Sequence, residues 1–148
     1  MQPFVLMIGL GVHSVFEGLA VGISDDLTDV LIMGLAIFLH KGAAAMSLGI
    51  SMAKTFPDDQ KLIHIVILSF AVFTPLGVAL GWIIGQGSEI LEVVFTSIAA
   101  GTFLYISCSE VIIEEFSDPS NKYLKLLAYL VGFGVIFSLI FIEGAAEG

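Results

Sequence analysis

Residues 4–23 read FVLMIGLGVHSVFEGLAVGI, an almost unbroken apolar run that holds one histidine and one glutamate. A helix of roughly 20 residues crosses the hydrocarbon core of a bilayer, which is about 30 Å thick. The run is therefore long enough to span a membrane, and it places His13 and Glu17 one helical turn apart on the same face. Because ionisable side chains at membrane depth are costly and usually face a polar cavity, this pair is the first candidate for a functional site.

The composition is that of an integral membrane protein. The 148 residues are 57% hydrophobic and 13% charged, and the mean hydropathy is +1.04, far above that of a typical soluble domain. Five stretches are long enough to span, and we place them near residues 2–23, 29–53, 62–87, 90–114 and 123–143. Their connections are short, so successive helices should be antiparallel neighbours. We therefore predict an all-α, polytopic, multi-pass protein of the plasma membrane or an intracellular organelle membrane, with residues 1–148 as a single transmembrane domain.

The charged residues narrow the choice of partners. The net charge of −9 comes from acids that lie mostly in the connections and at the C-terminus, where water solvates them. The chain has no arginine and no basic tract, so we expect no nucleic-acid partner. Cys108 is the single cysteine, which excludes a disulfide within the chain. Met1 leads almost directly into the first apolar run, so we expect a retained helix rather than a signal peptide.

The lysines predict how the helices are oriented. Lys54 and Lys61 flank the second connection, and Lys122 and Lys125 follow the fourth, whereas the first and third connections carry only acids. By the positive-inside rule, the second and fourth connections and the N-terminus are cytoplasmic, and the C-terminus lies on the other side. Lys41 is the exception, because it falls inside the second span.

A second histidine occurs at a matching depth. If the first helix begins near Gln2 and the second near Asp29, His13 and His40 each lie about 11 residues, or about 16 Å, into their helices. Both then fall near the midplane, although the helices enter from opposite sides. A single membrane histidine is often an interhelical hydrogen-bonding residue. Two imidazoles and the Glu17 carboxylate, however, form the donor set that zinc and similar divalent metals prefer.

Small residues surround the candidate ligands and recur in the third span. Gly18 and Gly22 follow Glu17, and a Gly-Ala-Ala-Ala segment, residues 42–45, follows the second histidine. We expect them to let the first two helices approach closely enough for three side chains to meet one ion. The third span has glycines at four-residue spacing, which permits either close helix packing or sliding between moving helices, at Gly77, Gly81 and Gly85.

Four further polar residues are candidates for the ion pathway. Ser14 and Ser47 carry hydroxyls that either line the route or bond to backbone, which is the commoner case. Lys41 follows the second histidine, about 100° around the helix, so its ammonium could pair with Glu17 or Glu110, or occupy the place of a second cation. Glu110, toward the cytoplasmic end of the fourth span, is either an exit ligand or a cap at the membrane interface.

Several segments together resemble the ZIP (Zrt/Irt-like) family of divalent-metal transporters. Residues 13–22, HSVFEGLAVG, resemble the signature of the fourth family helix, and residues 40–42, HKG, resemble the start of the fifth-helix motif. Residues 74–77, TPLG, and 99–105, AAGTFLY, resemble the sixth and seventh helices. The resemblance runs in order along nearly the whole chain. It implies a transporter rather than an enzyme, without a prosthetic group.

The resemblance also implies roles for individual residues. The metal ligands would be His13, Glu17 and His40. Ser14 occupies a position where many members have an asparagine that contributes to a second metal site, and Lys41 and Ala44 occupy positions where those members have acidic or histidine ligands. The resemblance therefore implies a single-metal site, with the Lys41 ammonium where the second cation would be.

Family members have eight spans in a three-two-three arrangement, and this chain resembles spans four to eight. Alternating access requires two bodies that move against each other. We therefore expect either a fragment of a longer gene product or missing helices supplied by another chain, such as the second copy in a homodimer. The expected activity is transport of zinc or a similar divalent metal ion through the lipid bilayer toward the cytoplasm, by alternating access around the midplane site.

Two other functions remain open from the sequence. In the first, His13 and His40 are the axial haem ligands of a membrane cytochrome, which leaves Glu17 and Lys41 unexplained. In the second, the chain is an inert or regulatory membrane fragment that folds without transporting anything.

Overall fold

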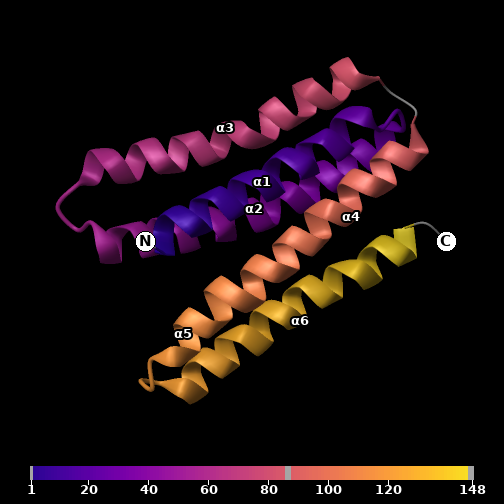
Figure 1. The fold of residues 1–148 in the computed structure, drawn as a ribbon. Coiled ribbons are helices and arrows are strands. Elements are labelled where there is room, and N and C mark those ends of the chain that lie inside the picture. Colours follow the sequence, from indigo (N-terminus) through magenta and orange to yellow (C-terminus); the bar gives the residue numbers. More distant parts are fainter. Residues whose placement is uncertain (1, 86–87, 147–148) are drawn as a thin grey trace. The chain divides into compact units, whose positions relative to one another are not determined.

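The computed structural model describes residues 2–85 and 88–146 of the chain. Residues 1, 86–87 and 147–148, which include the expected end of the third span, lie outside this description. Within it every element is helical, and the elements in chain order are α1 (Gln2–Ile23), α2 (Leu27–Thr55), α3 (Gln60–Ile84), α4 (Glu89–Ile106), η1 (Ser107–Ile112), α5 (Ile113–Ser117) and α6 (Lys122–Ala146). Figure 1 shows α1 to α4 running alternately in opposite directions.

The helices confirm the predicted fold class, an all-α polytopic membrane protein. Four helical stretches of the described chain are long and apolar enough to cross a membrane, namely Pro3–Ile23, Leu27–Thr55, Gln60–Ile84 and Glu89–Ser117. Helix α6 has 25 residues and covers the fifth expected stretch. The grouping of all five spans in one transmembrane domain stays a prediction.

Polar residues in the connections begin the helices as their types predict. The Asp26 carboxylate accepts a hydrogen bond of 2.7 Å from the Thr28 backbone at the start of α2. Asp59 accepts one of 3.1 Å from the Leu62 backbone at the start of α3. These acceptors satisfy N–H groups that the start of a helix leaves unpaired. Gly85 ends α3 with a φ of +123°, a conformation that favours glycine.

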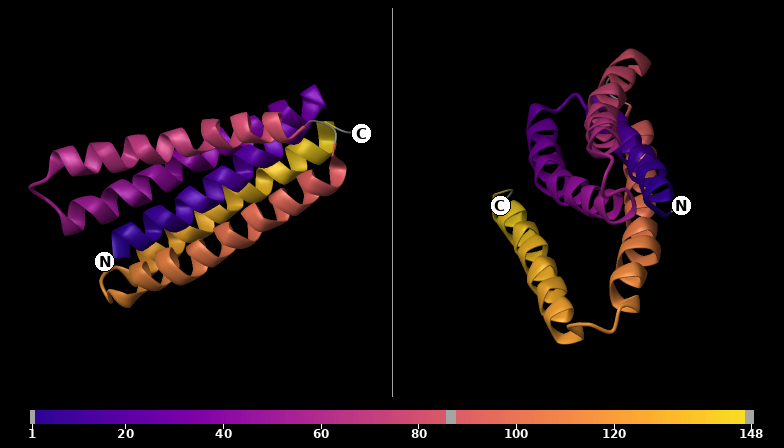
Figure 2. Two further views of the ribbon diagram at one scale, coloured as in Figure 1. Left: turned by 45° about the horizontal axis from the view of Figure 1, so that its top comes forward. Right: turned by 90° about the vertical axis from the view of Figure 1, so that its left-hand side faces the viewer.

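The described chain divides into two compact units between Val111 and Ile112. In the first unit α1 contacts α2, α3 and α4, so it is the central helix of this group (Figures 1 and 2). The buried apolar core of the unit is formed by Leu6, Leu10, Leu48, Met52, Ile63, Val66, Phe70 and Ile106.

In the second unit α5 and α6 contact each other across a short turn. Lys125 of α6 pairs with Glu115 at 3.4 Å and with Asp118 at 3.5 Å. The hydroxyl and the backbone N–H of Ser120 donate to Asp118 and lower its pKa to about 2. The turn therefore keeps this negative charge at physiological pH.

Helices α1 and α3 approach each other backbone to backbone. A Cβ atom on Gly18 would collide with the backbone oxygen of Thr74, and one on Gly77 would collide with the backbone of α1. One turn further on, Gly22 and Gly81 face each other in the same way. Two of the three glycines in the third span therefore serve close helix packing.

The expectation that Gly18, Gly22 and Gly42 bring α1 and α2 together was wrong. Gly18 and Gly22 face α3 instead, and no atom lies within 4 Å of the place where a Cβ on Gly42 of α2 would be. Gly85 also has open space around it and does not extend the contact with α1. The physical reason is that glycines at a spacing of four on both partners let two backbones interlock, and α3 offers the matching pair.

The fourth expected span, near residues 90–114, is helical but not regular. Helix α4 passes into the π-helical turn η1 at Ser107 and continues as α5. A π-helical turn inside an α-helix is rare and often marks a functional site. The polar segment Ser-Cys-Ser-Glu, residues 107–110, lies in this turn, which the hydrophobic pattern did not predict.

Candidate metal centre

His13 lies in the middle of α1 and is 6% exposed. Its Nδ1 atom is 2.9 Å from the backbone oxygen of Ala99 in α4. Because a carbonyl oxygen can only accept a hydrogen bond, Nδ1 carries the proton, and the lone pair of the neutral ring lies on Nε2. This Nε2 atom is buried and has no hydrogen-bond partner among the described residues. An unpaired buried acceptor is costly, so a bound cation would stabilise this arrangement.

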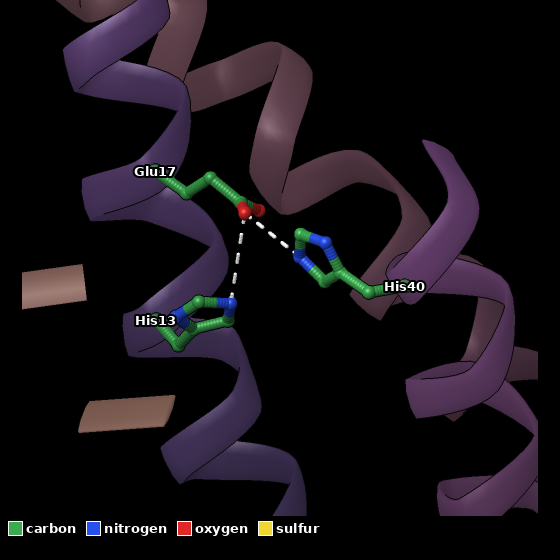
Figure 3. Close-up of side chains that lie close together, drawn as sticks. All are labelled: His13, Glu17 and His40. Carbon is green, nitrogen blue, oxygen red and sulfur yellow. Dashed lines mark ion pairs between the residues drawn. The ribbon is translucent and has the colours of Figure 1, made fainter. Parts of the chain in front are cut away.

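The Glu17 carboxylate lies close to both histidines (Figure 3). Its Oε1 atom is 2.8 Å from Nε2 of His40 and 3.8 Å from Nε2 of His13. One ligand atom from each of the three residues lies within 4.8 Å of the others, and these atoms come from α1 and α2. The fold therefore brings together the three residues that the sequence predicted as metal ligands.

The donor set has the chemistry of a zinc-type site. Zinc binds imidazole nitrogen and carboxylate oxygen at about 2.0–2.2 Å, so donors around one tetrahedral ion lie roughly 3.3–3.6 Å apart. The measured separations lie on both sides of that range, and side-chain movements of about 1 Å would bring the donors to it. Three protein donors leave a fourth position for water or another ligand, as in zinc sites that are not purely structural.

Lys41 is held by neutral groups on α1 and α3. Its Nζ atom donates to the Thr74 hydroxyl at 2.7 Å, to the Phe70 backbone oxygen at 3.3 Å and to the Ser14 hydroxyl at 3.4 Å. The same ammonium lies 4.2 Å from the centroid of the Phe70 ring, which is a cation–π contact. The lysine therefore ties α2 to both of its neighbours.

The carboxylate pairing that the sequence allowed for Lys41 is not formed. Within the described part of the chain, the lysine makes no ion pair with Glu17 or Glu110. Glu17 contacts the histidines instead, and Glu110 lies in η1, eleven residues beyond Ala99 and hence roughly 16 Å along the helix. Glu110 is half-buried, and its role as an exit ligand or an interface cap stays a prediction.

The two predicted serines lie at different distances from the centre. Ser14 is buried beside His13 and accepts the hydrogen bond from Lys41. Ser47 is half-buried in α2, two turns beyond His40, and is not part of the ligand cluster. The fold therefore places one serine beside the centre, and the roles of both in an ion pathway stay predictions.

Four neighbours of the centre are residues that the sequence did not single out, namely Phe70, Thr74, Ala99 and Phe103. Phe70 and Ala99 contribute backbone oxygens, for which the residue type gives no signal. Thr74 and Phe103 contribute a hydroxyl and an aromatic ring, which are common in apolar spans. The available signal was that both lie in the segments TPLG and AAGTFLY, which resemble family helices.

Comparisons with known proteins report the same relationship as the motifs. The family model for the ZIP zinc transporter matches residues 2–140. The chain is 36% identical over 147 residues to Zinc transporter ZIP1 of Homo sapiens. It is 32% identical over 145 residues to Zinc transporter ZIP3 of Bos taurus and 36% identical over 137 residues to Protein zntD of Dictyostelium discoideum.

These alignments cover most of the chain but a smaller share of the relatives. They include 97%, 93% and 88% of this chain, and 45%, 45% and 20% of ZIP1, ZIP3 and zntD respectively. The chain thus spans less than half the length of these relatives. No solved structure matches the chain. The family match nonetheless runs over nearly the whole sequence and confirms the resemblance of the motifs. The chain belongs to the ZIP zinc transporter family.

Proposed function

We propose that this chain binds zinc or a similar divalent metal ion as part of a transporter that carries the ion toward the cytoplasm. Family membership and the zinc transporters among the relatives support metal transport. The observation that carries the proposal is the buried Nε2 atom of His13, which has no hydrogen-bond partner in the described chain and lies 3.8 Å from Glu17. A cation that binds beside it during the transport cycle explains an unpaired ligand atom in a membrane span.

Binding exchanges part of the water shell of the ion for protein donors. The imidazoles of His13 and His40 supply neutral nitrogen, and Glu17 supplies an oxygen and one negative charge, which lowers the cost of a dication in an apolar layer. His13 lies about 16 Å from the start of α1 at Gln2, and His40 lies about 20 Å from the start of α2 at Leu27. We expect both histidines to lie near the midplane of the bilayer. A site at this depth suits alternating access, because the ion is then about equally far from either surface.

The helix contacts indicate which parts move together in this proposal. Helix α1 carries two ligands and interlocks with α3 through Gly18 and Gly22. Helix α2 carries the third ligand, and Lys41 ties it to α1 and α3. We therefore expect α1, α2 and α3 to move as one rigid body that carries the three donors, while access to the donors changes from one side of the membrane to the other.

Lys41 makes this a site for one ion in the proposal. Its ammonium is fixed between the Ser14 and Thr74 hydroxyls, next to the helix turn that carries the ligands. The fixed positive charge of Lys41 close to the ligands repels a second dication. It also offsets part of the negative charge of Glu17, so a second metal ion is not required to do so. Transport would therefore proceed with a single ion bound.

The second body of the transporter is expected to come from helices beyond those described. The chain spans 45% of ZIP1, and alternating access requires an opposing body. Helices in the same polypeptide or in a second copy of the chain would supply it.

The alternative function, a membrane cytochrome with two histidine ligands to haem, is not supported by the comparisons. In addition, the Glu17 carboxylate lies 2.8 Å from the His40 nitrogen that would have to bind the haem iron.

Zinc binding to the purified chain tests the proposal, using His64 as a matched control. His64 is exposed at the start of α3, and its ring contacts the Gln60 backbone oxygen at 2.6 Å. Calorimetry should show one zinc ion bound to the wild type and to His64→Ala, and markedly weaker binding to His13→Ala and His40→Ala. Equal zinc binding by His13→Ala and the wild type would remove the basis of the proposal.

A further inference from the structure

Phe103 of α4 contacts both candidate imidazoles. The centroid of its ring is 5.0 Å from that of His13, with the planes 43° apart, and 5.6 Å from that of His40, with the planes 66° apart. The two imidazole centroids are 5.9 Å apart. The three rings therefore form one cluster, in which a residue of α4 reaches ligands on both α1 and α2.

Helix α4 holds His13 at two points, one turn apart. The Ala99 carbonyl accepts the Nδ1 proton at 2.9 Å, and the same oxygen accepts from the Thr102 hydroxyl at 2.9 Å. Phe103 follows four residues after Ala99 and so lies on the same face of the helix. The hydrogen bond selects the tautomer, and the aromatic contact restricts rotation of the ring, so that Nε2 is the atom presented to Glu17.

For His40 the same phenyl ring adds a contact from α4 to those made by Glu17 and by the Ala36 backbone of its own helix. Its Nε2 atom is 2.8 Å from Glu17, and the imidazole lies edge to face with Phe103. A phenyl ring offers no metal donor and is a poor hydrogen-bonding partner for water. It therefore adds apolar surface beside the two imidazoles without adding to the coordination number.

We propose that Phe103 is a positioning and specificity-determining residue, which holds both imidazoles in the orientation for binding and keeps the metal four-coordinate. This inference rests on the proposed function and names the class of ion that the site would take. Zinc commonly binds three protein donors and one further ligand in a four-coordinate site. Ions such as Mn²⁺ and Mg²⁺ prefer six oxygen-rich ligands, which requires additional water molecules at the site, and the phenyl ring beside the imidazoles disfavours them. The site should therefore discriminate against them.

The chain offers a matched control for this ring. Phe95 lies on the same helix, two turns before Phe103, and packs against Phe16 of α1 with ring centroids 5.9 Å apart. Phe95→Ala therefore removes a ring of equal size from the same pair of helices at a place away from the histidines. Phe103→Leu keeps most of the apolar side-chain volume. Phe103→Val removes less of the side chain than Phe103→Ala and replaces it in the experiment if Phe103→Ala does not fold.

Cobalt binding to the full chain in lipid nanodiscs gives a direct readout, because four-coordinate Co²⁺ absorbs visible light much more strongly than six-coordinate Co²⁺. The wild type and Phe95→Ala should give the strong spectrum. Phe103→Ala should give the weak one, bind Co²⁺ about 10-fold less tightly or worse, and discriminate less between Zn²⁺ and Mn²⁺ in competition. Phe103→Leu should recover most of the affinity.

The outcomes separate this inference from the proposed function. Failure of the wild type to bind Co²⁺, or binding to His13→Ala that is as tight as binding to the wild type, would overturn both. A wild type with the six-coordinate spectrum would overturn the inference alone. So would Phe103→Ala or Phe103→Val behaving as Phe95→Ala does, while the three-ligand site itself would stand.

Discussion

The Nδ1 atom of His13 lies 2.9 Å from the backbone oxygen of Ala99, and this contact between α1 and α4 leaves Nε2 as the nitrogen that faces Glu17 and is available to a metal ion. The opposite tautomer would place a proton on the side of Glu17, where it would prevent binding of a cation. The orientation of one candidate ligand thus depends on a helix that contributes none of the three.

Loss of either histidine should abolish transport by an intact transporter that includes these helices. In His13→Ala or His40→Ala, a desolvated ion keeps only two of its three protein donors, so saturable zinc uptake should fall to background. Uptake of radioactive zinc at equal surface expression measures the effect, with His64→Ala as the control that stays active. Normal uptake in both variants would contradict the assignment of ligands.

Replacement of Lys41 by glutamate should create a second metal position. The change removes a fixed positive charge beside the site and adds a carboxylate near Ser14, so metal quantification on Lys41→Glu should show two ions per chain instead of one. Lys54→Glu alters an exposed lysine in the last turn of the same helix and should leave one. Two ions on the unmodified chain would show that Lys41 does not fill the second position.

Substitutions at the glycine contact should test the packing of α1 on α3. Gly18→Ala inserts a methyl group against the backbone oxygen of Thr74 and should destabilise the fold by about 1–3 kcal/mol. Gly42→Ala places the same group in open space on α2 and should be neutral or slightly stabilising. Unfolding in mixed micelles measures both variants, and equal stability of the two would show that the backbones of α1 and α3 are not in close contact.

Residues 1–148 alone should bind metal without transporting it. The ligands come from two consecutive helices that are both present, whereas alternating access needs an opposing body. Zinc flux into proteoliposomes should be absent for this chain and appear when an N-terminal three-helix segment is added. Saturable flux from the short chain that is lost in His13→Ala would instead show that these helices suffice, in an assembly of several copies.

The parts of the molecule that depend on local sequence could be predicted. Hydrophobic length predicts the helices, and the four-residue spacing of His13 and Glu17 predicts their common face. The matching depth of His40 in the next helix then brings the third ligand to the same level. These inferences succeed because helix geometry and bilayer thickness are fixed quantities.

The parts that depend on which helices are neighbours could not be predicted. Glycine spacing shows that α1 can pack closely, but it does not identify α3 as the partner. Lys41 is bonded to Thr74 and to a backbone oxygen rather than to a carboxylate, a choice that only the packing of α2 on α3 decides. The hydrogen bond from His13 to the Ala99 backbone could not be predicted from the type of residue at position 99, because any residue there has the same carbonyl group.

X-ray absorption at the zinc edge tests the central claim most directly, because it counts the ligands of the bound ion. With one equivalent of zinc on the purified chain, we expect a shell of nitrogen and oxygen at about 2.0–2.2 Å, with outer scattering from two imidazoles. The imidazole count should fall to one in His13→Ala and in His40→Ala at the zinc concentration that still loads the site. A shell without imidazole scattering, or one that neither substitution changes, would contradict the assignment of His13, Glu17 and His40 as the metal site.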